Sequence, residues 1–369
     1  MTRPVLAISN HGTFIGGGEH SFLDLISRLP GACPVIAALP AEGILAEKTR
    51  ERGMPTVIAP LPPMGLGHLL QMAGCIGRLR EICKTGQVRL IYANGSRAAF
   101  YGGVVGRLSS IPVIWHCRVS TADPWLDFLL LRLVDRIVAN SKATASRFPL
   151  SFRSKIDVVY NGFDLEWLRE SSVAKPVLIE DGWRTILVVA RASRWKRHDL
   201  ILTAFEKIAE TEQNAHLICV GNKDYSDLSW WDELQDKTRA SSFSSRIHWI
   251  GAVDDVRPWY RVASLLVLPS INEPFGRVVV EAMASGVPVI ATRSGGIPEI
   301  ITDMQNGLLV PENDAAALAA AVLKILHDPS LQGRLVEAGR ERAKRFSIDA
   351  HIHEMVNLFT DIVACSRKN

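Results

Sequence analysis

Two glutamates stand on either side of Gly276 with seven residues between them, in the run Asn272-Glu273-Pro274-Phe275-Gly276-Arg277-Val278-Val279-Val280-Glu281. A loop that opens into a helix at Gly276 would offer unpaired N–H groups and the positive end of the helix dipole to an anion. Glu273 would lie in the loop just before that anion, and Glu281 would share a helical face with Arg277, four residues earlier. Carboxylates on both sides of a phosphate site suit a ligand with hydroxyl groups at both ends and a diphosphate between them. A nucleotide sugar has that shape.

The neighbouring segments predict the elements that would position these glutamates. Leu265 to Leu268 is an apolar run typical of a buried strand, and the breakers from Pro269 to Pro274 end it. A helix follows from about Gly276, and Val287 to Ala291 is expected to be the next strand of a parallel sheet. A further helix is predicted to open in Ser294-Gly295-Gly296-Ile297-Pro298-Glu299. Two loops able to bind phosphate would then lie at adjacent strand ends.

Several stretches of this half resemble the nucleotide-binding half of the family-4 retaining glycosyltransferases, also called glycosyl transferase group 1. They are Glu273-Pro274-Phe275-Gly276, the spacing from Glu273 to Glu281, Ala282 to Thr292, Gly295-Gly296, and Asn306-Gly307-Leu308-Leu309-Val310. The resemblance implies the GT-B fold. It also implies transfer of a sugar from a UDP- or GDP-linked donor with retention of anomeric configuration.

Arg191 and Lys196 follow another predicted strand, Thr185 to Ala190. Cations at a strand end can neutralise a diphosphate, and the charge that develops on this leaving group is what a transition state must stabilise. The stretch also resembles the Gly-Arg-Leu…Lys-Gly stretch of the same enzymes, which maps their arginine and lysine onto Arg191 and Lys196. Ala190 and Arg197 stand where glycines are usual, so the conformation at Arg197 stays open. The alternative is a solvated basic turn.

His116 ends the predicted strand Ile111 to His116, and ligands of α/β proteins bind at the carboxyl ends of strands. Its imidazole could hydrogen-bond a sugar hydroxyl or the reacting centre. The resemblance implies that this histidine contacts the donor sugar, and Arg118 nearby could meet a phosphate. The alternative is a satisfied, partly buried histidine.

A glycine loop, Gly16-Gly17-Gly18, lies between the first predicted strand and the helix from Ser21. Glycines permit close backbone approach, so this loop could touch a phosphate or the acceptor, although a flexible turn is the alternative. Ser21 occupies the last position of G-x-G-x-x-G, which argues against a dinucleotide-binding oxidoreductase. Asn140 follows the strand Arg136 to Ala139 and could face a cleft.

The predicted site residues fall into two groups. Those expected to act in catalysis are His116, Arg191, Lys196 and Glu273. Those expected to bind substrate are Gly16, Gly17, Gly18, Arg118, Asn140, Pro274, Phe275, Gly276, Arg277 and Glu281. No two aspartates are separated by a single residue, so the Asp-x-Asp pair of many metal-dependent glycosyltransferases is absent. We therefore expect neither a metal nor another cofactor.

Composition is that of an ordinary globular protein, with 47% hydrophobic and 22% charged residues among 369. The six cysteines form no C-x-x-C pair and no zinc spacing, which indicates a reduced, cytoplasmic setting. No uninterrupted apolar segment approaches the roughly 18 residues of a spanning helix. A soluble or peripherally bound protein is expected.

Charge is unevenly distributed between the halves. Residues 1–165 contain 18 Lys and Arg against 11 Asp and Glu, whereas the remainder contains 24 against 27. A basic N-terminal half suggests a phosphorylated acceptor or an anionic membrane surface as partner, with scattered solvated charge as the alternative. The predicted helix from Gly65 to Lys84 combines apolar and basic residues and could lie on a membrane. A helix packed on the core is the other interpretation.

Apolar runs alternate with helical patterns along the chain, which predicts β-α-β units and two Rossmann-like α/β domains facing each other across a cleft. Residues 1–165 form an N-terminal acceptor-binding domain, and residues 166–346 a donor-binding domain. A polar linker without clear period spans Leu165 to Gly182. A last helix in 347–369 is expected to pack back on the N-terminal domain, as the resemblance implies.

The predicted partners are a nucleotide diphosphate sugar and an acceptor that is a glycan, a lipid-linked molecule or a small molecule; no nucleic acid is expected. Synthesis of cell-surface polysaccharide or glycoconjugate would use such a reaction. Alternatives that remain open are a nucleotide-sugar epimerase or glycan phosphorylase of the same fold, and a non-catalytic nucleotide-sugar-binding protein.

Overall fold

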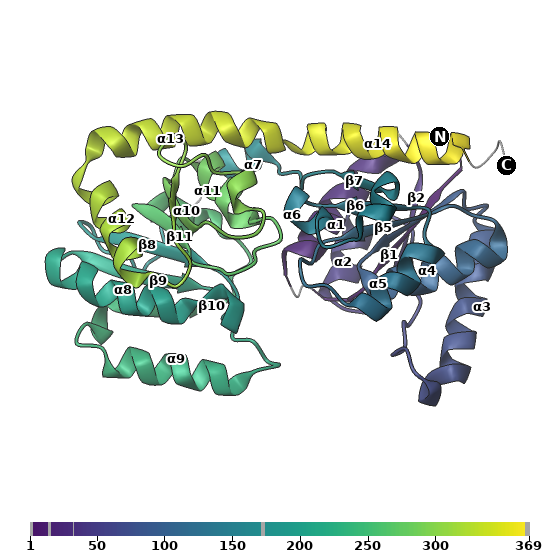
Figure 1. Cartoon of the computed structure of the whole chain (residues 1–369), viewed down its shortest axis with the longest axis horizontal. Coiled ribbons are helices and arrows are strands. Elements are labelled where there is room, and N and C mark those ends of the chain that lie inside the picture. The colour runs from purple at the N-terminus through teal and green to yellow at the C-terminus, as the bar shows by residue number, and fades with distance from the viewer. Residues whose placement is uncertain (1–2, 14–15, 32, 171–173, 366–369) are drawn as a thin grey trace. The chain divides into compact units, whose positions relative to one another are not determined.

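The chain folds into two compact α/β units (Figure 1). The structure, a computed structural model, describes residues 3–13, 16–31, 33–170 and 174–365. The N-terminal unit contains residues 1–162 together with 348–369, and the C-terminal unit contains residues 163–347.

A seven-stranded parallel sheet forms the centre of the N-terminal unit, in the order β3-β2-β1-β4-β5-β6-β7. Its strands are β1 Val5–Ser9, β2 Val35–Leu39, β3 Thr56–Ile58, β4 Leu90–Asn94, β5 Val113–Cys117, β6 Arg136–Ala139 and β7 Ile156–Val158. The central strands are buried along their length, because helices cover both faces of the sheet. This burial explains why their sequences are continuous apolar runs.

The helices of this unit form two layers on opposite faces of the sheet. They are α1 Gly17–Arg28, η1 Leu29–Gly31, α2 Ile44–Glu51, η2 Leu66–His68, α3 Leu69–Thr85, α4 Ser96–Ser109, α5 Pro124–Leu133, α6 Lys142–Ala145, η3 Leu150–Lys155 and α14 Ile348–Cys365. One core lies under α1, α2 and α14, and the other lies under α3, α4 and α5. The helix predicted from Gly65 is regular only from Leu69, because the segment before it forms the short turn η2.

The last helix, α14, is part of the N-terminal unit although the C-terminal unit precedes it in the chain. Met355 and Phe359 are fully buried in the core that contains Phe22 and Tyr92. The ring centroids of Tyr92 and Phe359 are 5.8 Å apart. Burial of these side chains therefore fixes α14 to the layer that α1 forms.

The C-terminal unit contains a six-stranded parallel sheet in the order β10-β9-β8-β11-β12-β13. Its strands are β8 Arg184–Val189, β9 Ala215–Val220, β10 Ile247–Gly251, β11 Leu265–Leu268, β12 Val289–Thr292 and β13 Leu308–Val310. Its helices are α7 Leu165–Arg169, η4 Arg194–Lys196, α8 His198–Thr211, α9 Leu228–Ala240, η5 Ser244–Arg246, α10 Arg257–Val262, α11 Arg277–Ser285, η6 Ile297–Glu299, α12 Ala315–His327, α13 Pro329–Ala343 and η7 Lys344–Phe346. Both units thus have the doubly wound plan that the sequence predicts.

Two further local predictions were wrong. The linker predicted from Leu165 begins with helix α7, because Asp164 caps it by accepting a hydrogen bond from the Trp167 N–H at 3.0 Å. Residues 171–173 of that linker lie outside the described residues. The helix predicted to open around Gly296 is only the single 3-10 turn η6.

Candidate functional site

Three loops of the C-terminal unit meet at the carboxyl ends of the adjacent strands β8, β11 and β12. Backbone hydrogen bonds join the first two loops, since the Ile271 N–H donates to the Trp195 carbonyl at 2.8 Å. The Asn272 N–H donates to Ser294 Oγ at 2.6 Å, and the Gly296 N–H donates to the Glu273 carbonyl at 2.7 Å. The predicted residues after β8 and β11 are therefore held at one edge of the sheet.

Gly295 and Gly296 make this close packing possible. A Cβ atom on Gly295, whose φ is +55°, would overlap the backbone of Glu273. A Cβ atom on Gly296 would lie 2.6 Å from the Pro274 carbonyl oxygen. The glycine pair thus serves to bring two backbones together at Glu273.

Lys196 and Glu273, both predicted to act in catalysis, form an ion pair with 2.6 Å between Nζ and Oε2. Both side chains are largely buried. The Lys196 ammonium also lies 4.0 Å from the centroid of the Trp195 ring. A cation from the loop after β8 and a carboxylate from the loop after β11 are therefore fixed next to each other.

Helix α11 begins at Gly276, which adopts φ +99° and ψ 56° and has no side chain to cap the helix. A side chain here would also collide with Ile297, whose Cδ1 would lie 2.5 Å from the added Cβ. Phe275 is buried, with its ring stacked on Phe163 at 6.2 Å, so only its backbone can face a ligand. Pro274 is partly buried. The helix thus opens at Gly276 as the sequence predicts, and anion binding by its first N–H groups stays a prediction.

Glu281 and Arg277 share one face of α11 as predicted, and both have further partners. Glu281 Oε2 accepts a hydrogen bond from the Tyr260 hydroxyl at 3.0 Å, and Oε1 lies 3.4 Å from Arg277 Nε. The Arg277 guanidinium stacks over Phe163, 4.6 Å from the ring centroid. Burial, then the Glu281 charge, raises the pKa of Tyr260 well above its usual range, so Tyr260 remains a donor. These contacts orient the Glu281 carboxylate, and Arg277 serves that orientation.

The arginines of the loop after β8 form ion pairs with partners that the sequence did not indicate. Arg191 is half-exposed, with its Nε 3.5 Å from Asp224 Oδ2. Arg197 adopts the left-handed conformation with φ 55°, which explains why a glycine would be usual there. Its guanidinium pairs with Asp199 at 2.9 Å and also contacts Asn313. These contacts hold a conformation that is unfavourable for a non-glycine residue.

In the N-terminal unit, Arg118 connects the ends of several strands. Its Nε donates to Asn94 Oδ1 at 2.9 Å, and its Nη1 donates to Asn161. Its Nη2 lies 3.3 Å from His116 Nδ1 and 3.5 Å from the Tyr92 hydroxyl. The phosphate contact predicted for Arg118 would therefore have to share a guanidinium that already binds four side chains. Asn94 and Tyr92 were missed because only the fold brings them to Arg118.

His116 lies one residue before the end of β5 and is fully buried. Its Nδ1 is 2.8 Å from the Tyr92 hydroxyl, whereas Nε2 has no hydrogen-bond partner among the described residues. Burial and, next, the Arg118 charge hold the pKa of His116 well below its usual range. The imidazole is therefore neutral at physiological pH and can act as a hydrogen-bonding group, not as a cation.

The glycine run lies beside Arg118, since a Cβ atom on Gly18 would be 3.6 Å from Arg118 Cδ. The helix predicted from Ser21 begins four residues earlier, so Gly17 and Gly18 belong to α1 and not to a loop. The Gly16 N–H donates to Glu19 Oε2 at 3.0 Å, Gly17 begins α1, and the Gly18 carbonyl accepts from Asn94 Nδ2 at 3.4 Å. Asn140 is buried, and its Oδ1 accepts from the Thr144 hydroxyl at 2.8 Å. This bond stabilises the turn into α6, and the role of Asn140 in substrate binding stays a prediction.

Two observations concern metal ions and membranes as partners. Among the described residues, no group of three or more His, Cys, Asp or Glu side chains could hold a metal ion. Within the same described ranges, no helix is long and apolar enough to cross a membrane.

Comparison with known proteins gives matches in both halves of the chain. The family described as glycosyl transferases group 1 matches residues 172–342, and the family described as Glycosyltransferase Family 4 matches residues 15–167. An uncharacterized glycosyltransferase of Methanocaldococcus jannaschii is 31% identical over 215 residues, which are 56% of this chain and 54% of that protein. A D-inositol 3-phosphate glycosyltransferase of Streptomyces avermitilis is 28% identical over 253 residues, 65% of this chain and 54% of that protein. The matched part of the chain thus spans about half the length of these curated relatives.

Solved structures match nearly the whole chain. Anabaena HepE in complex with UDP-glucose has a TM-score of 0.86 at 21% identity, over 97% of this chain and 99% of that one. Sucrose-phosphate synthase from Thermosynechococcus elongatus has a TM-score of 0.80 at 20% identity, over 98% of this chain and 100% of that one. Together with the two parallel-sheet units, these matches confirm the predicted GT-B fold.

Proposed function

Because the chain belongs to the family-4, or group 1, glycosyltransferases, we propose that it transfers a sugar from a nucleotide diphosphate sugar to an acceptor. The proposed donor is UDP- or GDP-linked. The proposed acceptor is a glycan, a lipid-linked molecule or a small molecule, as in the synthesis of polysaccharides or glycoconjugates. Retention of anomeric configuration is part of the proposal and derives from the family.

The observation that carries the proposal is the Lys196–Glu273 ion pair next to the uncapped start of α11. Departure of a nucleoside diphosphate develops negative charge, and an ammonium group together with helix N–H groups stabilises such charge. Arg191, half-exposed at the end of the neighbouring strand, would add a second cation. With these three contributions the leaving group needs no metal ion, so metal independence is part of the proposal.

The two glutamates have different proposed roles. Glu281 accepts from Tyr260 on one oxygen and pairs with Arg277 on the other, so its carboxylate is oriented in advance and keeps lone pairs for the ribose hydroxyls. Glu273 would accept hydrogen bonds from the transferred sugar, while Lys196 moves between this carboxylate and the diphosphate. In the N-terminal unit, His116 would act as a neutral hydrogen-bonding group, and the glycine run beside Arg118 would bind the acceptor.

A thermal-shift panel of UDP, GDP, ADP and their sugars, measured with EDTA, tests the proposal. A ligand that binds only the folded state at 100 times its Kd adds about 2.7 kcal/mol of stability. For a unit of this size that is about 5–10 °C. We expect one uridine or guanosine diphosphate sugar to give such a shift, and Glu281→Ala to abolish it.

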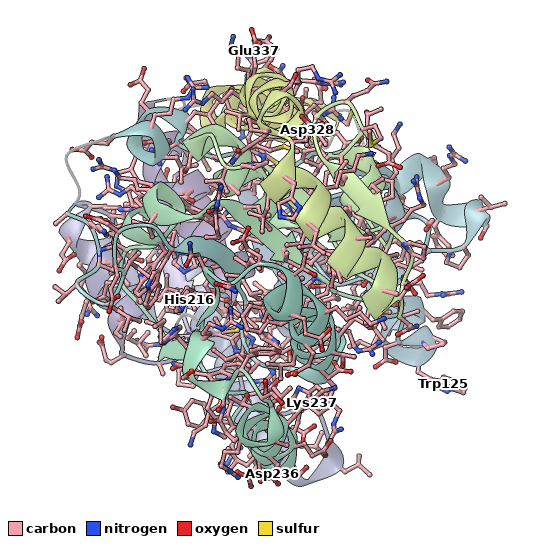
Figure 2. All side chains as sticks on the ribbon, turned by 90° about the vertical axis from the view of Figure 1, so that its left-hand side faces the viewer. Trp125, His216, Asp236, Lys237, Asp328 and Glu337 are labelled. Carbon is pink, nitrogen blue, oxygen red and sulfur yellow. The ribbon has the colours of Figure 1, made fainter. Side chains whose placement is uncertain are left out.

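Two further variants control for side effects. Glu281→Gln keeps an acceptor for Tyr260, and we expect it to retain the fold while losing most of the shift. Glu337→Ala, an exposed position on α13 that Figure 2 labels, should keep the full shift. Equal stabilisation of the wild type and both Glu281 variants would refute the ribose assignment.

Product analysis then distinguishes the reaction. Incubation with the identified donor and a panel of acceptors is expected to yield a glycosylated acceptor and free nucleoside diphosphate. Release of epimerised free sugar with the nucleoside diphosphate, independent of acceptor, would contradict transfer.

A further inference from the structure

An apolar protrusion stands out from the N-terminal unit at the start of α3. We call residues 64–74 the tip. Four of its large apolar side chains face solvent, with Leu66 88% and Leu70 91% exposed, and Met64 and Leu69 exposed as well. Met72 is the first residue of α3 that packs on the core, so the helix stands free of its unit for about 4.5 Å. Figure 1 shows α3 extending away from the other helices of this unit.

The base of the tip is fixed to the unit. Leu61 is buried, and the Tyr101 hydroxyl donates to the Pro62 carbonyl at 2.8 Å. Further along, Arg78 Nε donates to the Ile58 carbonyl at 2.9 Å. The segment that carries the exposed leucines is therefore held in place at its base. The leucines themselves are not buried in the core of this unit.

The tip lies at the same end of the sheet as the strand-end residues of the candidate site. The chain leaves β3 at its carboxyl end, and α3 returns it to the start of β4, parallel to the other strands. The N-terminus of α3 is consequently near the carboxyl ends, where Asn94 and Arg118 lie. A surface bound by the tip would face this end of the N-terminal unit.

The sequence on either side of the tip contains more basic than acidic residues. Between Arg52 and Asp123 the chain contains seven Lys and Arg residues and one acidic residue, Glu81. Three of these cations, Arg78, Arg80 and Lys84, are exposed on α3 itself. Arg78 follows Leu70 by about 12 Å along the helix axis. A tip inserted about 5–10 Å into a bilayer would bring this arginine to the depth of the lipid phosphates.

A second apolar surface occurs on α5. Trp125, Phe128 and Leu129 are exposed on one helical face, with Trp125 87% exposed. Figure 2 shows Trp125 pointing away from its helix. The Arg132 guanidinium covers the Phe128 ring at 3.4 Å from its centroid, which adds a cation to this face. Helix α4 contacts both α3 and α5, and all three pack on one core, so the tip and this face belong to the same layer.

We propose that the tip and the Trp125 face bind an anionic lipid bilayer, with the leucines and the tryptophan in the interface and Arg78 and Arg132 on lipid phosphates. The surplus of cations matches an anionic surface, for which each juxtamembrane Lys or Arg is favourable. A second copy of the chain fits less well, because a stable interface takes about 20–30 residues a side and the tip offers four apolar side chains. The inference does not depend on the proposed transfer reaction.

Co-sedimentation with vesicles of phosphatidylcholine, with or without 30 mol% phosphatidylglycerol, tests the proposal with the full chain. We expect binding to the anionic vesicles that weakens as salt is raised, and weaker binding to the neutral ones. The triple variant Leu66→Ser, Leu69→Ser, Leu70→Ser should lower the partition coefficient by roughly 30-fold. Trp125→Ala should lower it by a smaller factor. Because these vesicles contain no sugar acceptor, binding does not report on the catalytic site.

Matched variants exclude unspecific effects. Leu150→Ser and Val177→Ser replace other highly exposed apolar residues and should leave partitioning unchanged. All variants are expected to keep the thermal unfolding of the wild type, since the substituted side chains are exposed. Wild-type protein that binds neither vesicle, or a triple variant that binds as well as the wild type, would overturn the proposal. A dimer in sedimentation velocity that only the triple variant loses would identify the tip as a protein interface instead.

Discussion

Replacing Lys196 with methionine tests what the ion pair with Glu273 contributes. The pair has 2.6 Å between Nζ and Oε2, and the side chains are only 14% and 8% exposed. Breaking a buried pair from one side costs about 3–5 kcal/mol, because a desolvated charge remains. Because both side chains keep some exposure to solvent, we expect the lower end of this range, a loss of about 3 kcal/mol in the free energy of unfolding. For a unit of this size, this corresponds to a decrease in Tm of roughly 6–12 °C. Methionine keeps an apolar stem over Trp195, so lost packing contributes little.

The double variant Lys196→Met, Glu273→Gln separates stability from function. With both charges removed, we expect the free energy of unfolding to return to within about 1 kcal/mol of the wild type. Donor binding and turnover should not return, because the ammonium proposed to meet the diphosphate is still absent. A purely structural pair would instead recover activity together with stability.

Urea unfolding and release of nucleoside diphosphate are the two assays. Lys237→Met on α9, an exposed lysine labelled in Figure 2, is the control and should change neither. A Lys196→Met protein within about 0.5 kcal/mol of the wild type would refute the reasoning, as would a double variant as unstable as the single one.

Four further predictions concern the backbone and the dependence of stability on pH. Gly333→Ala should stabilise the C-terminal unit by about 0.5–1 kcal/mol in urea unfolding, because the added Cβ meets nothing in the middle of α13. Gly286→Ala, at φ +79° and against Arg340, should destabilise it, and a gain there would contradict the geometry. Gly295→Ala should force the β12 loop away from Glu273 and reduce turnover by more than tenfold in the donor assay; unchanged kinetics would count against the close packing. Burial, and then Lys196, lower the pKa of His198 to about 4. As pH falls from 6.5 to 4, His198 is protonated in the unfolded chain but still neutral in the folded protein. This difference lowers the free energy of unfolding by about 3 kcal/mol. In His198→Gln the free energy of unfolding should fall by that much less than in the wild type over the same pH range. Identical pH profiles of the two proteins would disprove this role of His198.

The sequence was most informative where burial alone determines the pattern. The strands Arg136–Ala139 and Leu265–Leu268 were predicted with their observed bounds, because a parallel strand covered on both faces is a largely apolar run. Helix α7 was missed, since its five residues are too few to show a helical period. The sequence predicted a helix where only the short turn η6 forms, because the residues at its start resemble those at the start of a longer helix.

Pairings between distant residues were beyond sequence reasoning. Arg118 meets Asn94 and Asn161 only because β4, β5 and the turn after β7 end at one edge of the sheet. Tyr260 reaches Glu281 because helix α10 packs on helix α11. By contrast, Lys196 and Glu273 were predicted to share a site, and neighbouring strand ends explain why they meet. Strand order was the missing information for Arg118, and helix packing was the missing information for Tyr260.

Titration calorimetry of the stabilising nucleotide sugar, in EDTA, tests the central claim most directly. We predict one binding site per chain in the wild type, at least tenfold weaker binding in Glu281→Gln and in the double variant Lys196→Met, Glu273→Gln, and unchanged affinity in Glu337→Ala. The corresponding nucleoside monophosphate should bind more weakly, because it lacks the phosphate that would meet Lys196. Equal affinity of all four proteins for the nucleotide sugar would show that the donor does not bind at the Glu273–Glu281 segment.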